Sequence, residues 1–177
     1  MSARRLDNIA RFYIERFATT ATHLRRVLAR RAERARRVHG GDAAEIAGWI
    51  EEIVSRLVRL GLVNDARYAA DRAASLRRLG RGPGRIRAAL MAKGVARSIV
   101  EEVLRESSET SSGEDASLNA AIAYVKRRRF GAYGKAPADK EAQAKKQKRE
   151  LAALSRAGFS YAAAQHALRQ SAEDNED

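Results

Sequence analysis

Apolar residues recur along most of this chain at the i, i+3, i+4 and i+7 spacing that places them on one side of an α-helix. The clearest example lies between Asp42 and Gly61, where aliphatic residues and Trp49 follow this rhythm. Turn signals such as Gly40-Gly41 and Gly80–Gly84 divide the pattern into segments, and the predicted helices fall into groups of three. The spacing predicts an all-α protein with three-helix repeats at 1–63, 64–106 and 116–172, an acidic linker at 107–115 and an acidic tail at 173–177.

A short motif ends corresponding helices in these repeats. The segment Leu90–Val95 returns 64 positions later as Leu154–Phe159, and Leu57–Leu62 is a looser copy. The motif predicts a helix that stops at glycine, buries the next apolar residue and restarts as another helix. Repetition on this scale is typical of stacked helical modules, which usually bind other molecules rather than catalyse, so we expect an elongated array of tandem repeats. The residues assigned to the joints are Gly61, Leu90, Gly94, Leu154, Gly158 and Phe159.

Two further patterns bear on how the repeats are divided. The triplets Arg78-Leu79-Gly80 and Arg129-Phe130-Gly131 hold matching places after the first helix of the second and third repeats. The joints at Gly61 and Gly94 are also 33 residues apart, as in arrays of helix pairs such as tetratricopeptide repeats. That division would require a joint near residue 127, inside a predicted helix, so we favour repeats of three helices.

Composition narrows the class of protein. The 177 residues include no cysteine, which excludes disulfides and thiolate metal sites and fits a reducing compartment. No apolar run reaches the ~18 residues that cross a bilayer. The N-terminus lacks an apolar stretch resembling a secretory signal. We therefore expect a cytoplasmic protein that does not associate with membranes.

Positive charge is concentrated rather than spread evenly. Lysine and arginine total 35 against 22 acidic residues, a net charge of +13. An arginine-rich composition inherited from a GC-rich genome would distribute these charges evenly, but residues 72–100 contain no acidic residue, and residues 126–149 carry ten cations against two acids. In each repeat the first two helices are basic, and the third is acidic or neutral. We expect three basic helical hairpins that attract a polyanion or an acidic protein surface.

Arginine is the main cation of these hairpins. Its planar guanidinium donates two parallel hydrogen bonds, which suits both phosphates and carboxylates. A solvated surface explains any single arginine equally well, so it is the repeated pattern that favours recognition. Tyr68, Tyr133 and Tyr161 could stack on bases, although the joints and the core suit them better. The residues expected to bind are Arg25, Arg26, Arg30, Arg77, Arg78, Arg81, Arg85, Arg87, Lys126, Arg127, Arg128 and Arg129.

The chain carries no arrangement typical of an enzyme. Gly80, Gly82 and Gly84 follow a predicted helix rather than a strand and lack the spacing of a phosphate loop, so a turn is predicted there. The histidines are scattered, without acidic or cysteine partners at metal-ligand spacing. We therefore expect no enzymatic activity, no catalytic residue, no cofactor and no metal site.

Several segments together resemble the RecX family, whose members regulate the RecA recombinase. The resemblance runs from about Ala10 to Leu168. It is carried most densely by Leu60–Ala69 and Arg78–Val95, and the closing segment Arg156–Ser160 is similar to the family's C-terminal signature. The order and spacing of these segments make the resemblance fairly specific.

The chain departs from the family pattern at 32–44, which is long and rich in arginine, and at 132–149, which extends the third repeat. The resemblance implies a monomer that binds in the groove of the RecA–single-stranded DNA filament and bridges adjacent subunits. It would thereby hinder filament growth, ATP hydrolysis, strand exchange and co-protease activity, with roles in homologous recombination, DNA repair and the SOS response. The implied partners are the RecA filament and single-stranded DNA, with double-stranded DNA as a further partner. The alternative is a free-standing helical DNA-binding protein, because three-helix units can present a recognition helix to a major groove.

Overall fold

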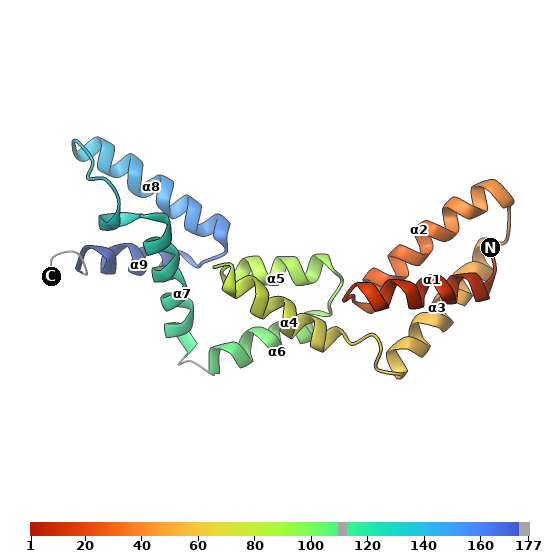
Figure 1. The fold of residues 1–177 in the computed structure, drawn as a ribbon. Coiled ribbons are helices and arrows are strands. Elements are labelled where there is room, and N and C mark those ends of the chain that lie inside the picture. The colour runs from red at the N-terminus through yellow and green to blue at the C-terminus, as the bar shows by residue number, and fades with distance from the viewer. Residues whose placement is uncertain (110–112, 174–177) are drawn as a thin grey trace. The chain divides into compact units, whose positions relative to one another are not determined.

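The computed structural model describes residues 1–109 and 113–173, and these residues form helices and no strand. Figure 1 shows the helices in the predicted groups of three. The all-α class and the tandem three-helix repeats are therefore confirmed. The elements are α1 (Ala3–Arg16), α2 (Ala21–His39), α3 (Ala43–Arg59), α4 (Asp65–Arg78), α5 (Pro83–Ala92), α6 (Arg97–Glu109), α7 (Gly113–Arg128), the short 3-10 helix η1 (Gly131–Tyr133), α8 (Lys140–Ala157) and α9 (Tyr161–Glu173).

The chain forms two compact units, and the division passes through the second repeat. One unit consists of residues 1–71 and 91–99, and the other of residues 72–90 and 100–177. Each end of the second repeat therefore packs with a different neighbouring repeat.

The predicted acidic linker at 107–115 is largely helical. The reason is that α6 continues to Glu109 and α7 already begins at Gly113. The centre of this linker, and the predicted tail at 173–177 apart from Glu173, lie outside the described residues.

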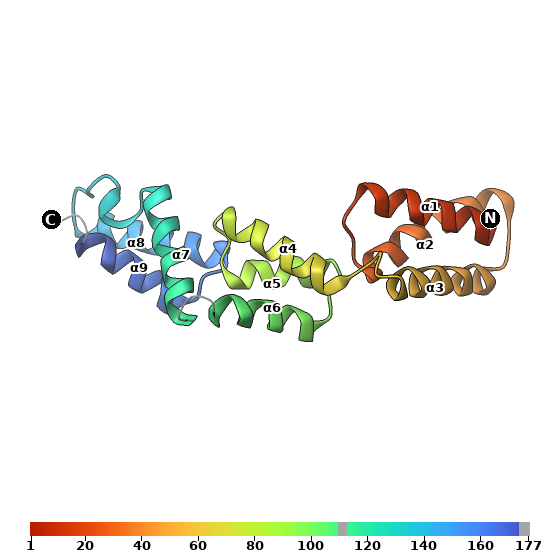
Figure 2. The same cartoon turned by 60° about the horizontal axis from the view of Figure 1, so that its bottom comes forward.

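In the first repeat, polar side chains fix where each helix begins. Ser2, Thr20 and Asp42 precede α1, α2 and α3, and each side-chain oxygen accepts a hydrogen bond from a backbone amide of the first turn. Figure 2 shows α1 and α3 running in the same direction, with α2 running the opposite way. Their facing sides fill one core, and Trp49 lies partly buried at its edge. The fully buried side chains of this core include Leu6, Leu24, Leu28, Val54 and Leu57.

The arginine-rich segment 32–44 continues α2 and ends it at Gly40. The Glu33 carboxylate accepts hydrogen bonds from Arg36 at 2.8 and 3.2 Å and from Arg37 at 3.1 Å. These bonds, together with the two positive charges, lower the pKa of the Glu33 carboxyl to about 2. The contacts join successive turns of the helix beyond the core of the repeat.

The leucine–glycine motif closes its helices as the sequence predicts. At the end of α8, Gly158 has a φ of +96°, its amide donates to the Ser155 carbonyl at 2.9 Å, and the Phe159 amide donates to the Leu154 carbonyl at 3.2 Å. The end of α3 repeats this arrangement at Gly61, where φ is +69°. This pair of bonds, the Schellman motif, satisfies carbonyls that a helix end otherwise leaves free. Leu154 and Phe159 are both buried, as expected.

One detail of the first joint differs from the prediction. Leu62, directly after Gly61, is 57 % exposed, and the buried residue is Val63 at 2 %. The amides of Leu62 and Val63 both donate to the Leu57 carbonyl, at 3.0 and 3.3 Å, so the turn is one residue longer before the chain re-enters the core.

The ends of α4 and α7 match each other, but in a different register from the one predicted. The amides of Gly80 and Arg81 donate to carbonyls of the last turn of α4 at 2.7 and 3.0 Å. At the end of α7 the amides of Arg129 and Phe130 do the same at 3.1 and 3.0 Å. Gly80 therefore corresponds to Arg129 rather than to Gly131. Arg129 adopts a φ of +53°, which is uncommon for a residue with a Cβ atom.

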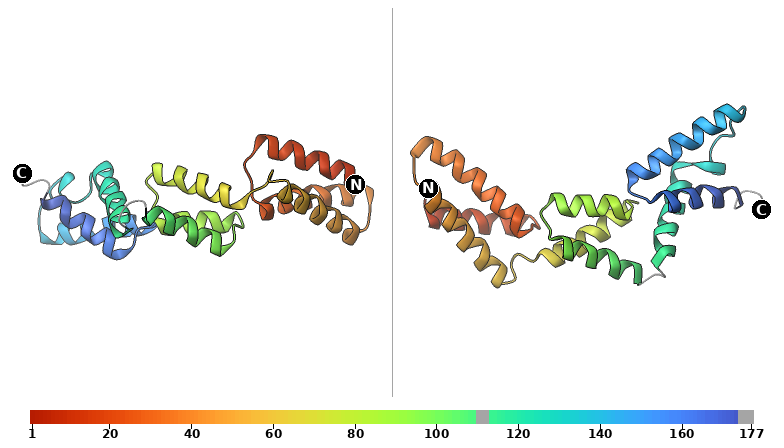
Figure 3. Two further views of the ribbon diagram at one scale, coloured as in Figure 1. Left: turned by 90° about the horizontal axis from the view of Figure 1, so that it is seen from below. Right: turned by 180° about the vertical axis from the view of Figure 1, so that it is seen from behind.

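The core of the third repeat is rich in aromatic contacts. The Tyr124 ring meets Phe130 and Phe159 edge-on, with ring centroids 6.1 and 5.7 Å apart. Figure 3 gives two further views of this repeat, in which α9 packs against α7, α8 and η1. The joint residue Phe159 therefore belongs to the same core as the helices that it connects.

Replacing Arg129 with glycine should raise the free energy of unfolding by roughly 0.5–1 kcal/mol, because glycine adopts a positive φ without a Cβ penalty. Urea unfolding followed by circular dichroism measures this change. Gly80→Ala is the matched variant at the corresponding position and should lower stability by about 1 kcal/mol or more. A Cβ atom there would have a φ of +69° and lie 2.9 Å from the guanidinium carbon of Arg127. Equal stabilities of Arg129→Gly and the parent protein would contradict the strain at Arg129.

The Glu33 carboxyl should titrate near pH 2 instead of near its usual 4.5, as followed by carbon NMR. Because the folded pKa lies below the unfolded value, the contact contributes its full stability above pH 4.5 and loses it as the pH falls towards 2. Arg36→Gln should move the midpoint towards 4.5, since Arg36 is the largest cause of the shift. Arg25→Gln, on the same helix, serves as control. An unchanged midpoint in Arg36→Gln would show that the hydrogen bonds are not the cause.

Candidate polyanion-binding surface

The turn between α4 and α5 docks backbone to backbone on the joint that ends α8. The Gly82 amide donates to the Ala157 carbonyl at 2.9 Å, and the Gly84 amide donates to the Gly158 carbonyl at 3.0 Å. A Cβ atom at Gly82 would lie 2.6 Å from the Gly158 carbonyl carbon, so this approach requires glycine. Pro83 is the first residue of α5, a position where its missing amide hydrogen leaves no helix bond unmade. These two glycine amides already have acceptors, which agrees with the prediction of a turn rather than a phosphate loop.

The joint between α5 and α6 docks on the first repeat in a similar way. Gly94 has a φ of +79°, and the carbonyl of Lys93 beside it accepts a hydrogen bond from the Thr20 hydroxyl at 2.6 Å. At the start of α4, the Asp65 carboxylate accepts a hydrogen bond from the Ala21 amide at 2.8 Å. Of the predicted joint residues, Gly158 makes such a contact itself, and Gly94 directly follows Lys93, which makes another.

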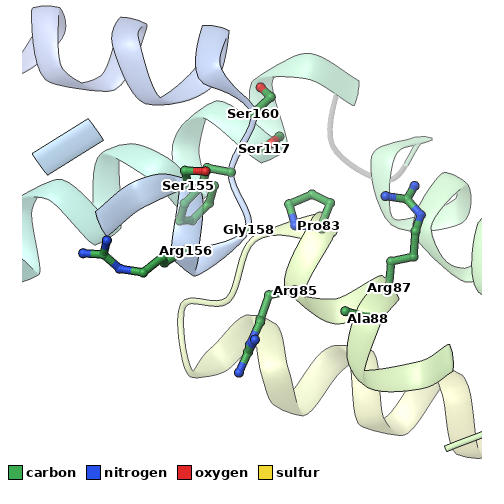
Figure 4. Close-up of a pocket in the computed structure, with 11 residues that line it drawn as sticks. Pro83, Arg85, Arg87, Ala88, Ser117, Ser155, Arg156, Gly158 and Ser160 are labelled. Carbon is green, nitrogen blue, oxygen red and sulfur yellow. The ribbon is translucent and has the colours of Figure 1, made fainter. Parts of the chain in front are cut away.

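Three of the predicted arginines are exposed near the docked turn. Arg78 ends α4, Arg81 lies inside the glycine-rich segment Gly80–Gly84, and Arg85 directly follows that segment. Within the described part of the chain, their guanidinium groups have no hydrogen bond or ion pair. Figure 4 shows Arg85 on the α5 side of the joint and Arg156 on the α8 side, with Gly158 in between. Both arginines line a hollow of 520 Å³ together with several serines, so this surface offers cations and hydroxyl groups to an anion.

Two other predicted arginines are engaged in ion pairs. The Arg25 Nε donates to the two carboxylate oxygens of Glu51 at 2.7 and 3.0 Å. Arg87 makes a two-bonded contact with Glu101, with both distances 2.9 Å. The hydrogen bond with Glu101 raises the pKa of Arg87. Each of these arginines would have to give up its carboxylate in order to bind a phosphate, which makes it a weaker candidate than the exposed group.

Three more predicted arginines hold backbone carbonyls. Arg26, Arg77 and Arg127 each donate through a guanidinium nitrogen, and burial lowers the pKa of Arg77 because the charged form loses its water. The acceptors are the carbonyls of Ala92 (3.3 Å), Val103 (3.2 Å) and Leu79 (3.4 Å), respectively. These side chains have structural contacts beside the predicted binding role.

The cluster Lys126–Arg129 comes together at the end of α7, and all four side chains are exposed. The first three lie over the rings of Tyr133, Tyr124 and Phe130, with the cation 5.6, 5.6 and 5.8 Å from the respective ring centroid. Cation–π contacts of this kind orient the charged groups while they remain in water.

One further group of cations was not predicted from the sequence. Arg5, Arg31 and Arg34, together with the predicted Arg30, line a hollow of 710 Å³ between α1 and α2. The spacing of Arg30 and Arg34 by four residues is visible in the sequence. Their meeting with Arg5 depends on how the two helices pack, which the sequence pattern did not reveal.

Over the described part of the chain, no group of three or more His, Cys, Asp and Glu residues is arranged to hold a metal ion. No helix in it combines the length and apolar character needed to span a membrane.

Comparison with known proteins identifies the family. A family profile described as the second three-helix domain of RecX matches residues 64–104. The regulatory protein RecX of Myxococcus xanthus (strain DK1622) is 39 % identical over 163 residues, which cover 92 % of this chain and 83 % of the relative. The similarity to this family therefore extends over most of the chain, well beyond the domain that the profile matches.

Solved structures show the same fold. The crystal structure of RecX from Lactobacillus salivarius superimposes with a TM-score of 0.67 at 19 % identity and covers 95 % of both chains. A second crystal structure, of a regulatory protein RecX, gives a TM-score of 0.64 at 19 % identity and covers 95 % of this chain and 71 % of the other. Sequence identity and fold agree, and the chain belongs to the RecX family of regulatory proteins.

Proposed function

We propose that this protein modulates the RecA recombinase without catalysing a reaction, by binding in the groove of the RecA–single-stranded DNA filament. Bound there, it hinders filament growth and, with it, ATP hydrolysis, strand exchange and co-protease activity. The observation that carries this proposal is membership in the RecX family, with a relative that matches nearly the whole chain.

The charge of the protein supports a polyanionic partner of this kind. The net charge is +13, and a filament on single-stranded DNA carries one phosphate per nucleotide. The exposed Arg78, Arg81 and Arg85 can bind phosphates or acidic side chains without breaking an internal contact. The paired Arg25 and Arg87 cannot do so.

Repetition supports a partner that is itself repetitive. Once one basic hairpin has docked, the next is held close to its own site, so a weak second contact gains from a high effective concentration. Bridging adjacent subunits inhibits only if the protein binds the arrested filament more tightly than the growing one, because a ligand shifts an equilibrium by its difference in affinity between the two states. Contacts that span two subunits can supply this difference in affinity between the arrested and the growing filament, because they depend on how the two subunits are arranged.

The test is a titration of the protein into a reaction of RecA, ATP and single-stranded DNA while ATP hydrolysis is followed. Inhibition at protein concentrations too low to coat the DNA supports the proposal. A gel shift with bare duplex runs in parallel. Tight duplex binding without any effect on RecA would contradict the proposal and favour a free-standing DNA-binding protein.

Arg81→Glu and Arg85→Glu should each weaken binding to the filament by roughly tenfold or more, because each loses a charge-assisted hydrogen bond and places a repelling carboxylate beside the anion. Helicity and melting temperature should stay unchanged, since both side chains are exposed. Arg169→Glu, an exposed change on α9 with the same effect on net charge, is the control and should bind normally. Equal weakening in all three variants would show that only net charge matters.

A further inference from the structure

The hollow between α1 and α2 has a regular construction. On α1, Arg5, Ile9 and Tyr13 follow one another at intervals of four residues, and on α2 Arg30 and Arg34 do the same. Residues at this spacing lie on one side of a helix, so the two helices face each other with two matching rows. The apolar members form the floor, and the arginines rise from both sides.

No acidic residue lines this groove. The nearby carboxylates bind other arginines: Asp7 binds Arg11 and Arg56, and Glu33 binds Arg36 and Arg37. Within the described residues, the side chains of the four groove arginines, Arg5, Arg30, Arg31 and Arg34, have no hydrogen bond or ion pair. Four like charges therefore share one hollow without a counter-charge.

The positive field extends to the neighbouring histidine. His23 lies on α2, with its ring centroid 6.4 Å from that of Tyr13. Burial lowers the pKa of His23, and the charges of Lys93, Arg30 and Arg26 lower it further, since they oppose a second cation nearby.

Aromatic side chains lie beside this groove, Phe12 on α1 and Phe17 directly after its last residue. Phe12 is 52 % exposed, and the Arg16 guanidinium lies 4.2 Å from its ring centroid. Phe17 is 55 % exposed and lies 5.1 Å from Tyr13, ring centroid to ring centroid. At about 100° per residue, Phe12 and Arg16 share the side of α1 that carries Arg5. Single apolar side chains scattered on a surface are normal, but large exposed rings grouped beside a cationic groove indicate a binding site.

We propose that the α1–α2 groove binds single-stranded nucleic acid directly, with the arginines on the phosphates and Phe12 and Phe17 stacking on bases. A positive groove beside aromatic rings is the combination by which proteins hold single strands without reading sequence. The aromatic rings favour a single strand over a duplex, because the bases of a single strand are free to stack on them. The stretch Val27–His39 of α2 extends for about 18 Å, enough for a few nucleotides. Single-stranded DNA is already a partner that the family resemblance implies, and the proposal adds where on this chain a strand binds, and by which residues, in the absence of RecA.

The first experiment measures binding of the full-length protein to a short fluorescent oligothymidylate by anisotropy over a range of salt concentrations. The double variant Arg30→Gln/Arg34→Gln loses two phosphate contacts. The slope of log K against log salt should therefore become shallower by about 1.4, at about 0.7 per phosphate on single strands. The control is Arg36→Gln/Arg37→Gln, which removes the same charge from the same helix at arginines already bound to Glu33.

The second experiment tests stacking. Phe12→Ala should weaken binding of oligothymidylate about fivefold or more. It should leave binding of an abasic sugar–phosphate chain of the same length unchanged. A single strand should compete better than a duplex of equal phosphate content.

Three results would overturn the proposal. The first is equal loss of slope in the two double variants, because net charge alone would then explain binding. The second is unchanged oligothymidylate affinity in Phe12→Ala. The third is displacement by polyglutamate together with duplex competition as strong as that of single strand, which would mark the groove as a site for acidic protein segments. None of these binding experiments contains RecA, so their outcomes are independent of the experiment that tests RecA inhibition.

Discussion

The close approach between the α4–α5 turn and the end of α8 is the constraint on which the exposed arginine surface depends. Two backbone amides, of Gly82 and Gly84, reach carbonyls of the α8–α9 joint directly. A side chain at either Gly82 or Gly158 would collide with backbone, and a buried amide left unpaired costs about 1–3 kcal/mol. These contacts fix the backbone of the turn against the end of α8. They thereby fix the positions from which the side chains of Arg81 and Arg85 extend. The position of the charged groups thus follows from a contact that contains no charge.

Arginine has two separate roles in this fold, which differ in whether the guanidinium is paired with a carboxylate. On α2, Arg36 and Arg37 bind Glu33, whereas Arg30 and Arg34 line the groove and have no carboxylate partner among the described residues. A paired arginine adds a modest local contact on an exposed surface. Unpaired neighbours repel each other, which destabilises the protein alone and is relieved when an anion binds. The groove therefore has a reason to bind a phosphate chain that the paired arginines of the same helix lack.

The sequence was sufficient for the joints and insufficient for the charged surfaces, for physical reasons. Leu154, Gly158 and Phe159 could be predicted because a Schellman turn is a local structure with a local signature. The position of Arg129 at the end of α7 could not be predicted, because Arg129 adopts a positive φ that usually marks a glycine. The predicted match between the ends of α4 and α7 was therefore wrong by two residues. The state of Arg87 depends on Glu101, which lies 14 residues away on another helix. Such pairing depends on how two helices pack, and the periodicity of one helix does not predict it.

The two exposed arginine groups differ in chemistry, and the difference bears on the proposed binding to a nucleoprotein filament. The turn group, Arg78, Arg81 and Arg85, lies beside a hollow lined mostly by serines, glycines and cations, and such a surface accepts phosphate or carboxylate alike. The α1–α2 groove adds aromatic rings, which favour bases that are unstacked. A filament on single-stranded DNA offers acidic protein surface and a single strand together. A chain with one general anion surface and one strand-selective groove would therefore gain most affinity where both ligands occur in the same assembly, and less on duplex DNA or on free protein.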